Sequence, residues 1–401
     1  MVEVAAKHRI VIIGAGQAGA RCAESLRLKG HTGPITILGD EQEPPYERPP
    51  LSKSLLAGLT NVESHRVLPL DWYLNHQVSL RLGSRVEYVD RLASQVIIQG
   101  GSSLPYDKLV FATGSRPRLL GQGAWVLRSV QDSLDLSREI DSGRRLLIVG
   151  AGLIGLEVAA TARSKGMEVT LIEAANWPMV RVVPRQISQY LVELHKTQGV
   201  HWVLDARIAF VDETQVKLED GTVLVGDVVL VAIGVMPNDD LARTAGLPTD
   251  DGILVDEFGC TADAAIYATG DCARLAHHLS STPIRIETWQ HSELHPQTVA
   301  SAICGDPKPY REVPWAWSDQ YGVNLQMSGW THSADAEVWR GDPSSGGATL
   351  FMLQHASDDQ FFVIGATSIN RSIDQRSARR LISKKTLVSK IDISDLNRSL
   401  P

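Results

Sequence analysis

The sequence predicts an α/β protein with two similarly built halves and a third, mixed α+β domain. A unit of strand, glycine turn, helix and strand occurs twice in the 401 residues, with the two turns 136 residues apart. The composition then changes after residue 312, because three of the nine Trp fall within 315–330 and a basic tail follows. Strands that alternate with helices in this way favour parallel sheets.

The first unit begins with an apolar run at 9–13, which predicts a buried strand. The turn GAGQAG (14–19) follows, and a helical stretch runs from about residue 18 to 29. A second apolar run, ITIL (35–38), predicts the next strand. This order is that of a βαβ unit.

The second unit repeats the order. LLIV (146–149) predicts a strand, GAGLIG (150–155) a glycine turn, and a helix then runs to about residue 165. The next strand, VTLI (169–172), ends at Glu173. The chain therefore contains the same unit twice.

Each unit is followed by alternating strands with a tight turn, at 100–101 in the first and 220–221 in the second. Both units then reach a related segment, 107–117 or 227–238, with an acidic start, an apolar run and a glycine after the strand. A further strand, IYATGDCA (266–273), leads without another glycine turn to a helix that ends near Cys304.

These segments predict three domains. The first is discontinuous, with residues 1–116 and 243–312, the second covers 117–242, and the third covers 313–401. The third domain contains strand-like runs at about 335–340, 348–354 and 360–367, followed by the basic helical tail.

Composition excludes several classes of protein. The net charge of −7 argues against general affinity for nucleic acid. Because no apolar run approaches the ~18 residues that cross a bilayer and no secretory segment is visible, we expect a cytoplasmic protein without a membrane partner. The four cysteines show neither a CxxC nor zinc-ligand spacing, so we expect no dithiol centre and no metal site. They are Cys22, Cys260, Cys272 and Cys304.

Each glycine in GxGxxG has its own task in binding a dinucleotide. The first permits the tight turn, the second lets the backbone approach the pyrophosphate, and the third lets helix and strand pack closely. A bare glycine turn is the alternative for either copy alone. Both copies, however, have an acid about 20 residues on that suits ribose hydroxyls, so we predict two Rossmann-like domains. The first site has Gly14, Ala15, Gly16, Gly19 and either Asp40 or Glu41; the second has Glu173 as its acid.

Two dinucleotide folds imply two dinucleotides. The usual combination is tightly held FAD with diffusible NADH, which passes a hydride to the flavin. Gly270-Asp271 supports flavin, because a glycine and an acid at a strand end suit close backbone approach and a hydrogen bond to a ribitol hydroxyl. A surface β-turn is the alternative for that pair.

The motifs resemble those of two-dinucleotide flavoprotein reductases, and among these the NADH-dependent ferredoxin reductase components of aromatic-ring-hydroxylating dioxygenases, of the biphenyl and phenylpropionate type. Putidaredoxin reductase, rubredoxin reductases and monodehydroascorbate reductases share most of the pattern. The resemblance spans essentially the whole chain. It rests on GAGQAG, PYERPPLSK (45–53), FATGSRP (111–117), GAGLIGLEVAATA (150–162), IYATGDCA and PWAWSDQY (314–321).

The resemblance implies FAD in the first unit and NAD in the second. FAD contacts are implied for Asp40, Arg48, Lys53, Val86, Arg128, Asp271 and Trp289. The implied nicotinamide site comprises Gly152, Leu153, Ile154, Gly155, Glu157, Glu173 and Gly234, together with Arg181 and Glu287.

The chain departs from related enzymes in two places. Residues 290–297 read QHSELHPQ where relatives favour an Asn-Ala pair, and Pro296 removes a donor from that helix unless it lies in the first turn. Residues 40–60 contain no Cys, whereas related disulfide reductases need a CxxC there. Flavin hydroxylases resemble the first unit alone. The electrons are therefore expected to leave through an outside partner.

Lys53 and Glu157 have two interpretations. The two prolines of RPPLSK favour a helix start with Lys53 in its first turn, while Glu157 lies just past the second glycine turn. Both side chains are ordinary solvated residues in the first interpretation. In the second they form an ion pair beside the flavin N5, where Lys53 stabilises negative charge on the reduced ring and Glu157 contacts either the nicotinamide carboxamide or the lysine.

Trp317 is the predicted electron exit. In an extended segment Trp315 and Trp317 point the same way, and packing in the core is the alternative. The tail 371–401 holds eight Lys or Arg against three Asp, a balance of +5, which suits an acidic partner. We expect Arg376, Arg379, Arg380, Lys384 and Lys385 to form a cationic helix face, with Ile373, Leu381 and Ile382 facing inward.

The function expected from these features is oxidation of NADH by an FAD enzyme, with single electrons passed to a [2Fe–2S] ferredoxin and through it to a terminal oxygenase. A rubredoxin reductase or a reductase of quinones or ascorbate radical is the enzymatic alternative. A redox-signalling flavoprotein similar to apoptosis-inducing factor is the non-enzymatic one. The sequence names neither the ferredoxin nor the aromatic substrate.

Overall fold

The computed structural model describes residues 7–331 and 334–401 and divides them into two compact units. The first unit comprises the described residues up to Pro49, Asn61–Arg116 and Val235–Glu312. The second comprises Pro50–Thr60, Pro117–Gly234 and the described part of Val313–Pro401. The predicted three-domain division is finer than these units and stays a prediction.

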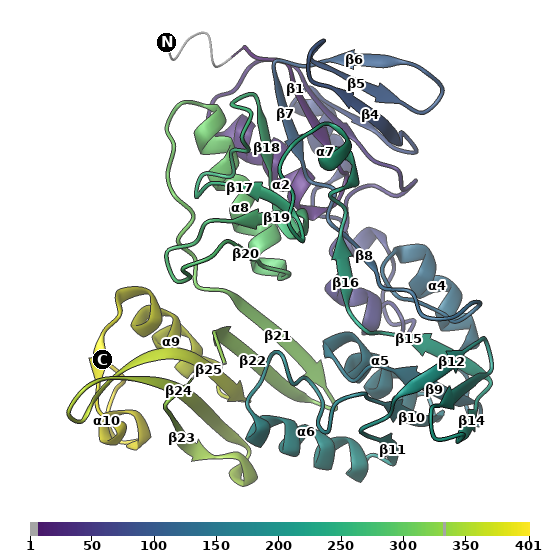
Figure 1. Cartoon of the computed structure of the whole chain (residues 1–401), viewed down its shortest axis with the longest axis vertical. Helices are drawn as coiled ribbons and strands as arrows, with labels where there is room; N and C mark the ends of the chain where they lie inside the picture. Colours follow the sequence, from purple (N-terminus) through teal and green to yellow (C-terminus); the bar gives the residue numbers. More distant parts are fainter. Residues whose placement is uncertain (1–6, 332–333) are drawn as a thin grey trace. The chain divides into compact units, whose positions relative to one another are not determined.

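The first unit is built on a parallel sheet in the order β18-β7-β1-β2-β3, and Figure 1 labels β1, β7 and β18 of it. The apolar runs of the sequence become its central strands, which are buried on both faces as parallel strands require. The helices α2 and α8 pack against each other. The bounds are β1 Ile10–Ile13, β2 Ile35–Leu38, β3 Val78–Arg81, β7 Lys108–Phe111, β18 Ile266–Ala268, α2 Gln17–Leu28, α3 Leu70–Asn75 and α8 Trp289–Ile303.

Smaller strand groups complete the first unit. The predicted hairpin at 100–101 joins β5 to β6, and both glycines there have positive φ. β16 Val235–Pro237 pairs with β8 Ser115–Pro117. The remaining bounds are β4 Val86–Asp90, β5 Gln95–Ile98, β6 Ser103–Pro105, β17 Ile253–Val255, β19 Ala273–Leu275, β20 Ile284–Arg285 and α7 Asp240–Thr244.

The second unit contains a parallel sheet in the order β11-β10-β9-β15 and a separate antiparallel group, β12-β13-β14. The predicted turn at 220–221 joins β13 to β14. The bounds are β9 Arg145–Val149, β10 Glu168–Ile172, β11 Val200–Val203, β12 Ile208–Val211, β13 Gln215–Leu218, β14 Val223–Val225, β15 Val228–Val231, α4 Val130–Glu139, α5 Leu153–Ser164 and α6 Arg185–Thr197.

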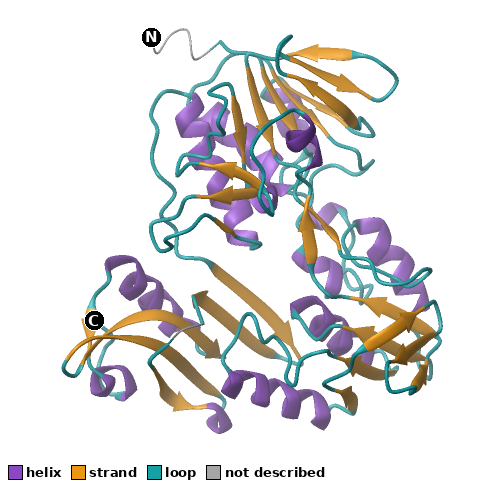
Figure 2. Ribbon diagram, in the orientation of Figure 1, coloured by secondary structure: helices purple, strands orange, loops and turns teal. Residues whose placement is uncertain are grey.

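The C-terminal part of this unit is an antiparallel sheet with two helices (Figure 2). The three predicted strand runs are confirmed as β23, β24 and β25. The bounds are β21 Trp315–Gln320, β22 Val323–Gly329, β23 Ala336–Asp342, β24 Gly347–Ser357, β25 Gln360–Ile369, β26 Leu387–Val388, α9 Ser372–Lys384 and α10 Lys390–Ser394.

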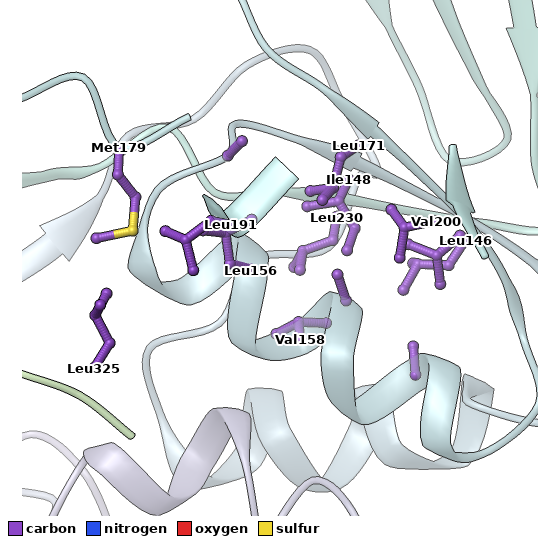
Figure 3. Close-up of a cluster of buried hydrophobic side chains, with 14 of the residues drawn as sticks. Leu146, Ile148, Leu156, Val158, Leu171, Met179, Leu191, Val200, Leu230 and Leu325 are labelled. Atoms are coloured by element: carbon purple, nitrogen blue, oxygen red, sulfur yellow. The ribbon is translucent and has the colours of Figure 1, made fainter. Parts of the chain in front are cut away.

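The core of the second unit joins its parallel sheet to the C-terminal sheet. Leu146, Ile148 and Leu230 pack with Leu156 of α5 and belong to the same buried cluster as Leu325 of β22 (Figure 3). Helix α5 also packs against β21. Burial of these apolar side chains therefore fixes β21 beside the helix that carries Glu157.

The helix predicted to end near Cys304 is confirmed as α8, and the short strands β19 and β20 separate it from β18. Two sequence-based expectations were wrong in detail. The prolines at 49 and 50 start a 3-10 helix, Pro49–Ser52, and Lys53 follows it instead of lying in its first turn. Ile373 is 76% exposed, whereas Leu381 and Ile382 of the same helix are buried as predicted.

Candidate functional site

The first glycine of each turn is required by the fold. Gly14 and Gly150 have φ of +116° and +101°. A Cβ on Gly14 would lie 2.1 Å from the Ala112 carbonyl oxygen, and one on Gly150 would lie 2.5 Å from that of Ala232. Both positions therefore exclude a side chain by conformation and by contact with the neighbouring strand.

The third glycine of each turn lets the helix approach its own turn. A Cβ on Gly19 would lie 2.0 Å from the Gly14 carbonyl oxygen, and a Cβ on Gly155 would lie 2.1 Å from that of Gly150. Real Cβ atoms do not come so close, so the helix could not start where it does. The two turns share this constraint.

The middle glycines differ from the other two. A Cβ on Gly16 or Gly152 would meet nothing within 4 Å, so the protein itself does not require glycine there. Both residues are N-caps, and as glycines they have no side chain that could accept a hydrogen bond from the first amides of the helix. The space in front of a helix N-terminus, where only an added ligand would contact the backbone, fits a dinucleotide pyrophosphate at each turn.

Two acids follow β2, Asp40 and Glu41, and their surroundings differ. Glu41 accepts a hydrogen bond from the Tyr46 hydroxyl at 2.5 Å and from Arg48 at 2.9 Å. Burial alone would lower the pKa of Arg48, but its interactions with Tyr46, Glu41 and Asp271 outweigh burial, so the pKa is raised. Asp40 is exposed beyond the strand end. Tyr46 and Arg48 therefore hold the carboxylate of Glu41 and not that of Asp40.

Glu173, at the end of β10, contacts the second glycine turn directly. Its Oε2 accepts from the Ala151 amide at 2.8 Å, and its Oε1 accepts from the Ala175 amide at 2.9 Å. Each carboxylate oxygen has two lone pairs, so one acceptor position on each oxygen remains for a ribose hydroxyl. The two amides orient the carboxylate next to the turn.

Gly270 and Asp271 lie beside the first glycine turn. Gly270 has φ +73°, and a Cβ there would lie 2.9 Å from Cβ of Ala18, in the first turn of α2. Asp271 accepts a hydrogen bond at 2.8 Å from Ser115, a residue that the sequence reasoning missed although it belongs to the FATGSRP motif. Gly270 is buried and begins the 3-10 helix Gly270–Cys272, so the alternative of a surface β-turn does not hold for this pair.

The remaining candidates lie in several environments. Arg181 is exposed in the second unit, and its guanidinium would lie 3.2 Å from a Cβ on Gly234, so these two candidates are neighbours. Val86 is a buried core residue at the start of β4. The backbone of Arg128, before α4, donates to Asp132. Trp289 begins α8 in the first unit, and Glu287 there pairs with Arg285.

Lys53 and Glu157 form the predicted ion pair, with 2.6 Å between Lys53 Nζ and Glu157 Oε2. Glu157 is only 4% exposed and also accepts hydrogen bonds from Ser52 and, at 2.7 Å, from Ser318. Ser52 and Ser318 were missed by the sequence reasoning, because nothing local marks a serine that meets a carboxylate from another segment. The solvated interpretation of Glu157 is wrong.

Trp315 and Trp317 stack with ring centroids 5.2 Å apart, as their alternation in an extended strand predicts. Both are partly exposed, so the alternative that they are core residues does not hold. The Arg379 guanidinium lies over the Trp315 ring, 5.4 Å from its centroid. Arg376, Arg380, Lys384 and Lys385 are exposed along α9, although Arg380 also donates to carbonyl oxygens of the last two residues.

Helix α8 contains a buried histidine pair that the sequence reasoning left without a role. Pro296 lies inside this helix and not in its first turn. His291 and His295 are both 0% exposed and stack on each other, with ring centroids 4.5 Å apart. Burial lowers the pKa of His291 to about 3 and that of His295 well below its ordinary value. Both imidazoles are therefore neutral near pH 7.

No helix among the described residues is both long enough and apolar enough to cross a bilayer. All four cysteines are free thiols. Burial raises the pKa of Cys22 to about 12, so this thiol stays protonated.

Comparisons with known proteins bear on both units. The pyridine nucleotide-disulphide oxidoreductase model matches residues 8–296, and the reductase C-terminal model matches 315–401. The chain is 40% identical over 396 residues to the anthranilate 1,2-dioxygenase system ferredoxin–NAD(+) reductase component of Burkholderia cepacia, with 96% of each chain covered. It is 38% identical over 385 residues to rhodocoxin reductase of Rhodococcus erythropolis, with 93% of this chain and 89% of the relative covered.

Among solved structures, the covalent putidaredoxin reductase–putidaredoxin complex matches with a TM-score of 0.93 at 34% identity and covers 97% of this chain and 96% of that one. These matches confirm the family resemblance and the fold class predicted from the sequence, with two Rossmann-like parts and a C-terminal domain. The chain therefore belongs to the pyridine nucleotide-disulphide oxidoreductase family.

Proposed function

We propose that this protein is an FAD-dependent ferredoxin–NAD(+) reductase, which oxidises NADH and passes electrons one at a time to a [2Fe–2S] ferredoxin that feeds an aromatic-ring dioxygenase. The observation that carries the proposal is the pair of glycine turns whose middle residues face open space. Full-length similarity to a reductase component of a dioxygenase system supports the choice of acceptor.

In this proposal FAD belongs to the first glycine turn and NADH to the second. When bound, the flavin supplies the change from a two-electron donor to one-electron acceptors. Gly16 and the N-terminus of α2 hold the FAD pyrophosphate, and Asp40 and Asp271 accept its hydroxyl groups. Gly152 and the N-terminus of α5 hold the NADH pyrophosphate, and Glu173 accepts the ribose hydroxyls.

Lys53 supplies positive charge that favours the reduced form of the flavin, and Glu157 keeps that lysine in one place. Support comes from the short contact between the two groups and from the burial of Glu157, since an ammonium fixed by a buried carboxylate need not reorganise during the reaction. Lys53→Met should retain the fold but slow bleaching of the flavin by NADH.

Trp317 and the cationic face of α9 serve as the electron exit in this proposal. The Trp stack is partly exposed, and Arg379 covers Trp315 with a second cation, Arg376, one helical turn earlier. Such a surface suits an acidic protein partner better than an uncharged quinone. The cytoplasmic location expected from the sequence stays a prediction.

The test uses purified holoprotein under nitrogen. It should be yellow, bleach when NADH is added, and reduce cytochrome c rapidly only after a [2Fe–2S] ferredoxin is added. Equally rapid reduction of a rubredoxin or a quinone without ferredoxin would replace the proposed acceptor. A colourless protein that binds no flavin would refute the assignment as a flavoenzyme.

A further inference from the structure

Glu157 lies at the end of a buried chain of hydrogen bonds that begins on α6. His195 Nε2 contacts Gln320 Oε1 at 2.8 Å, Gln320 Nε2 donates to Ser318 Oγ at 2.9 Å, and Ser318 Oγ donates to Glu157 Oε1 at 2.7 Å. All four side chains are 4% exposed or less. The chain therefore runs through the interior of the second unit.

Donors and acceptors in this chain have one consistent direction. The Glu157 carboxylate only accepts, so Ser318 must donate to it and use a lone pair for the Gln320 amide nitrogen. The Gln320 oxygen then accepts from His195, which fixes its Nε2–H tautomer. His195 Nδ1 is left as the acceptor for the Tyr321 hydroxyl at 3.4 Å. Every hydrogen points toward Glu157, and aligned bonds of this kind strengthen one another.

His195 is uncharged near neutral pH, so the direction of the hydrogen bonds is preserved there. Burial lowers its pKa to about 4. The groups packed against the ring are the Gln320 amide, the Tyr321 hydroxyl and the Trp202 indole, all of which are neutral there. Burial also raises the pKa of Tyr321 above its ordinary value. The same groups therefore donate throughout the neutral pH range.

Strand β21 carries two sets of side chains on opposite faces. Ser318 and Gln320 are buried on the face that packs against α5, whereas Trp315 and Trp317 are partly exposed and stack on the other face. The strand that presents the Trp pair is therefore the same one that holds Glu157.

We propose that Ser318, supported by Gln320 and His195, is a positioning residue that holds one oxygen of Glu157, so that the other oxygen fixes Lys53. This inference rests on the proposed function, since it assigns Ser318 a part in flavin reduction by way of Lys53. Without the serine hydroxyl the carboxylate loses a donor and its charge is less compensated. The field of Lys53 that favours the reduced flavin is then weaker.

The experiment measures the flavin midpoint potential and the rate of anaerobic bleaching by NADH in Ser318→Ala, Ser318→Thr and Gln320→Leu. Loss of a hydrogen bond to a charged group changes a rate or equilibrium constant by about tenfold or more. Ser318→Ala should therefore slow bleaching by about tenfold and lower the flavin midpoint potential. Gln320→Leu should give a smaller loss, and the threonine hydroxyl should restore the wild-type values. In a Glu157→Gln background, Ser318→Ala should add little.

The matched control is Ser328→Ala, which removes another buried hydroxyl from the same sheet, one that donates at 2.5 Å to the neutral amide of Gln375. It should leave the potential and the bleaching rate unchanged. Equal effects of the two alanine variants, or a Ser318→Ala protein with wild-type potential and rate, would overturn the inference. If Ser318→Ala does not fold, a wild-type potential and rate in Gln320→Leu would overturn it. Failure of wild-type protein to bleach with NADH would instead refute the proposed function.

Discussion

The two glycine turns agree in their backbone and differ in their side chains. In both, the first and third glycines are excluded from carrying a Cβ by contacts of 2.0–2.5 Å, and the middle glycine faces open space. The acids that follow the second strands are placed differently. Glu41 is held by Tyr46 and Arg48, whereas Glu173 is held by two backbone amides, one of them within its own glycine turn.

This difference indicates which parts of a repeated unit are fixed by geometry. A tight turn between a strand and a helix has few solutions, so both copies retain the same three glycines. The acid after the strand is a partly exposed side chain whose partners depend on the following loop. The first loop continues into the Tyr46–Arg48 segment, and the second returns to its own glycine turn, so the two acids acquire different partners.

The largest predicted effect comes from replacing the third glycine of each turn, because each replacement should abolish binding of a different dinucleotide. Gly19→Ala should give a protein that does not retain FAD and is colourless, while Gly155→Ala should remain yellow but no longer bleach at ordinary NADH concentrations. Each Cβ would overlap a carbonyl oxygen, at a cost of about 1–3 kcal/mol or more in folding of the turn. Absorbance of the purified proteins and NADH titration check both outcomes.

The control uses the middle glycines. Gly16→Ala and Gly152→Ala add the same methyl group in open space at negative φ, so thermal stability of the ligand-free proteins should match wild type. Cofactor affinity should nevertheless fall, because the backbone can no longer approach the pyrophosphate. Unchanged affinity for both cofactors would mean that the dinucleotides bind elsewhere.

The second prediction concerns the acid that contacts the second turn. Glu173 should make the enzyme prefer NADH, since its carboxylate accepts ribose hydroxyls and repels the 2′-phosphate of NADPH. Loss of a hydrogen bond to a charged group is worth ~1.5–3 kcal/mol, so Glu173→Ala should lower kcat/KM for NADH by about 10- to 100-fold. A wild-type enzyme that uses NADPH equally well would contradict this role.

The third prediction uses a feature of the first unit alone, the neutral pair His291 and His295 in α8. Their pKa values are lowered on folding, so below the ordinary value of about 6.5 the unfolded chain binds protons that the folded chain does not. Stability should thus be constant above about pH 6.5 and fall as the pH drops toward 3. At pH 5 each histidine should contribute a loss of about 2 kcal/mol.

Flavin fluorescence reports the unfolding of the first unit by release of FAD. The midpoint temperature of this release, measured between pH 7.5 and 5, should fall less in His291→Leu and His295→Leu than in wild type. An identical pH dependence in all three proteins would show that other groups control acid sensitivity. No such histidine pair is present in the described parallel-sheet region of the second unit, where His195 has Gln320 as a partner.

The comparison also shows how far sequence reasoning reaches. The glycine turns, the parallel strands, the hairpins at 100–101 and 220–221 and the Trp stack all follow from local patterns, because spacing and period determine them. The Lys53–Glu157 pair was placed by resemblance to a family, not by local pattern.

The partners of Glu157 could not be predicted in the same way. Ser318 and Gln320 come from a strand more than 150 residues away, and a buried serine in a strand has no local signature. The exposure of Ile373 was also missed, because helical periodicity fixes which residues share a face but not which of two partly apolar faces is buried.

The smallest predicted effect is on the electron exit. Ferredoxin reduction should slow severalfold as salt rises from ~50 to ~300 mM, because screening weakens attraction between an acidic partner and the α9 arginines, whereas bleaching by NADH should barely change. Trp317→Ala should depress the ferredoxin step more than ferricyanide reduction. Ferredoxin kinetics that ignore both salt and charge reversal at Arg379 and Arg380 would put the exit elsewhere.

Anaerobic titration of the holoprotein with NADH tests most directly whether each glycine turn serves one dinucleotide. Absorbance near 450 nm should fall in proportion to added NADH in wild type, with about one equivalent needed per bound FAD, since a hydride carries both electrons. Gly152→Ala should keep its FAD and need a large excess of NADH to bleach. Wild-type bleaching in Gly152→Ala, or loss of FAD from that variant, would contradict the assignment of the two turns.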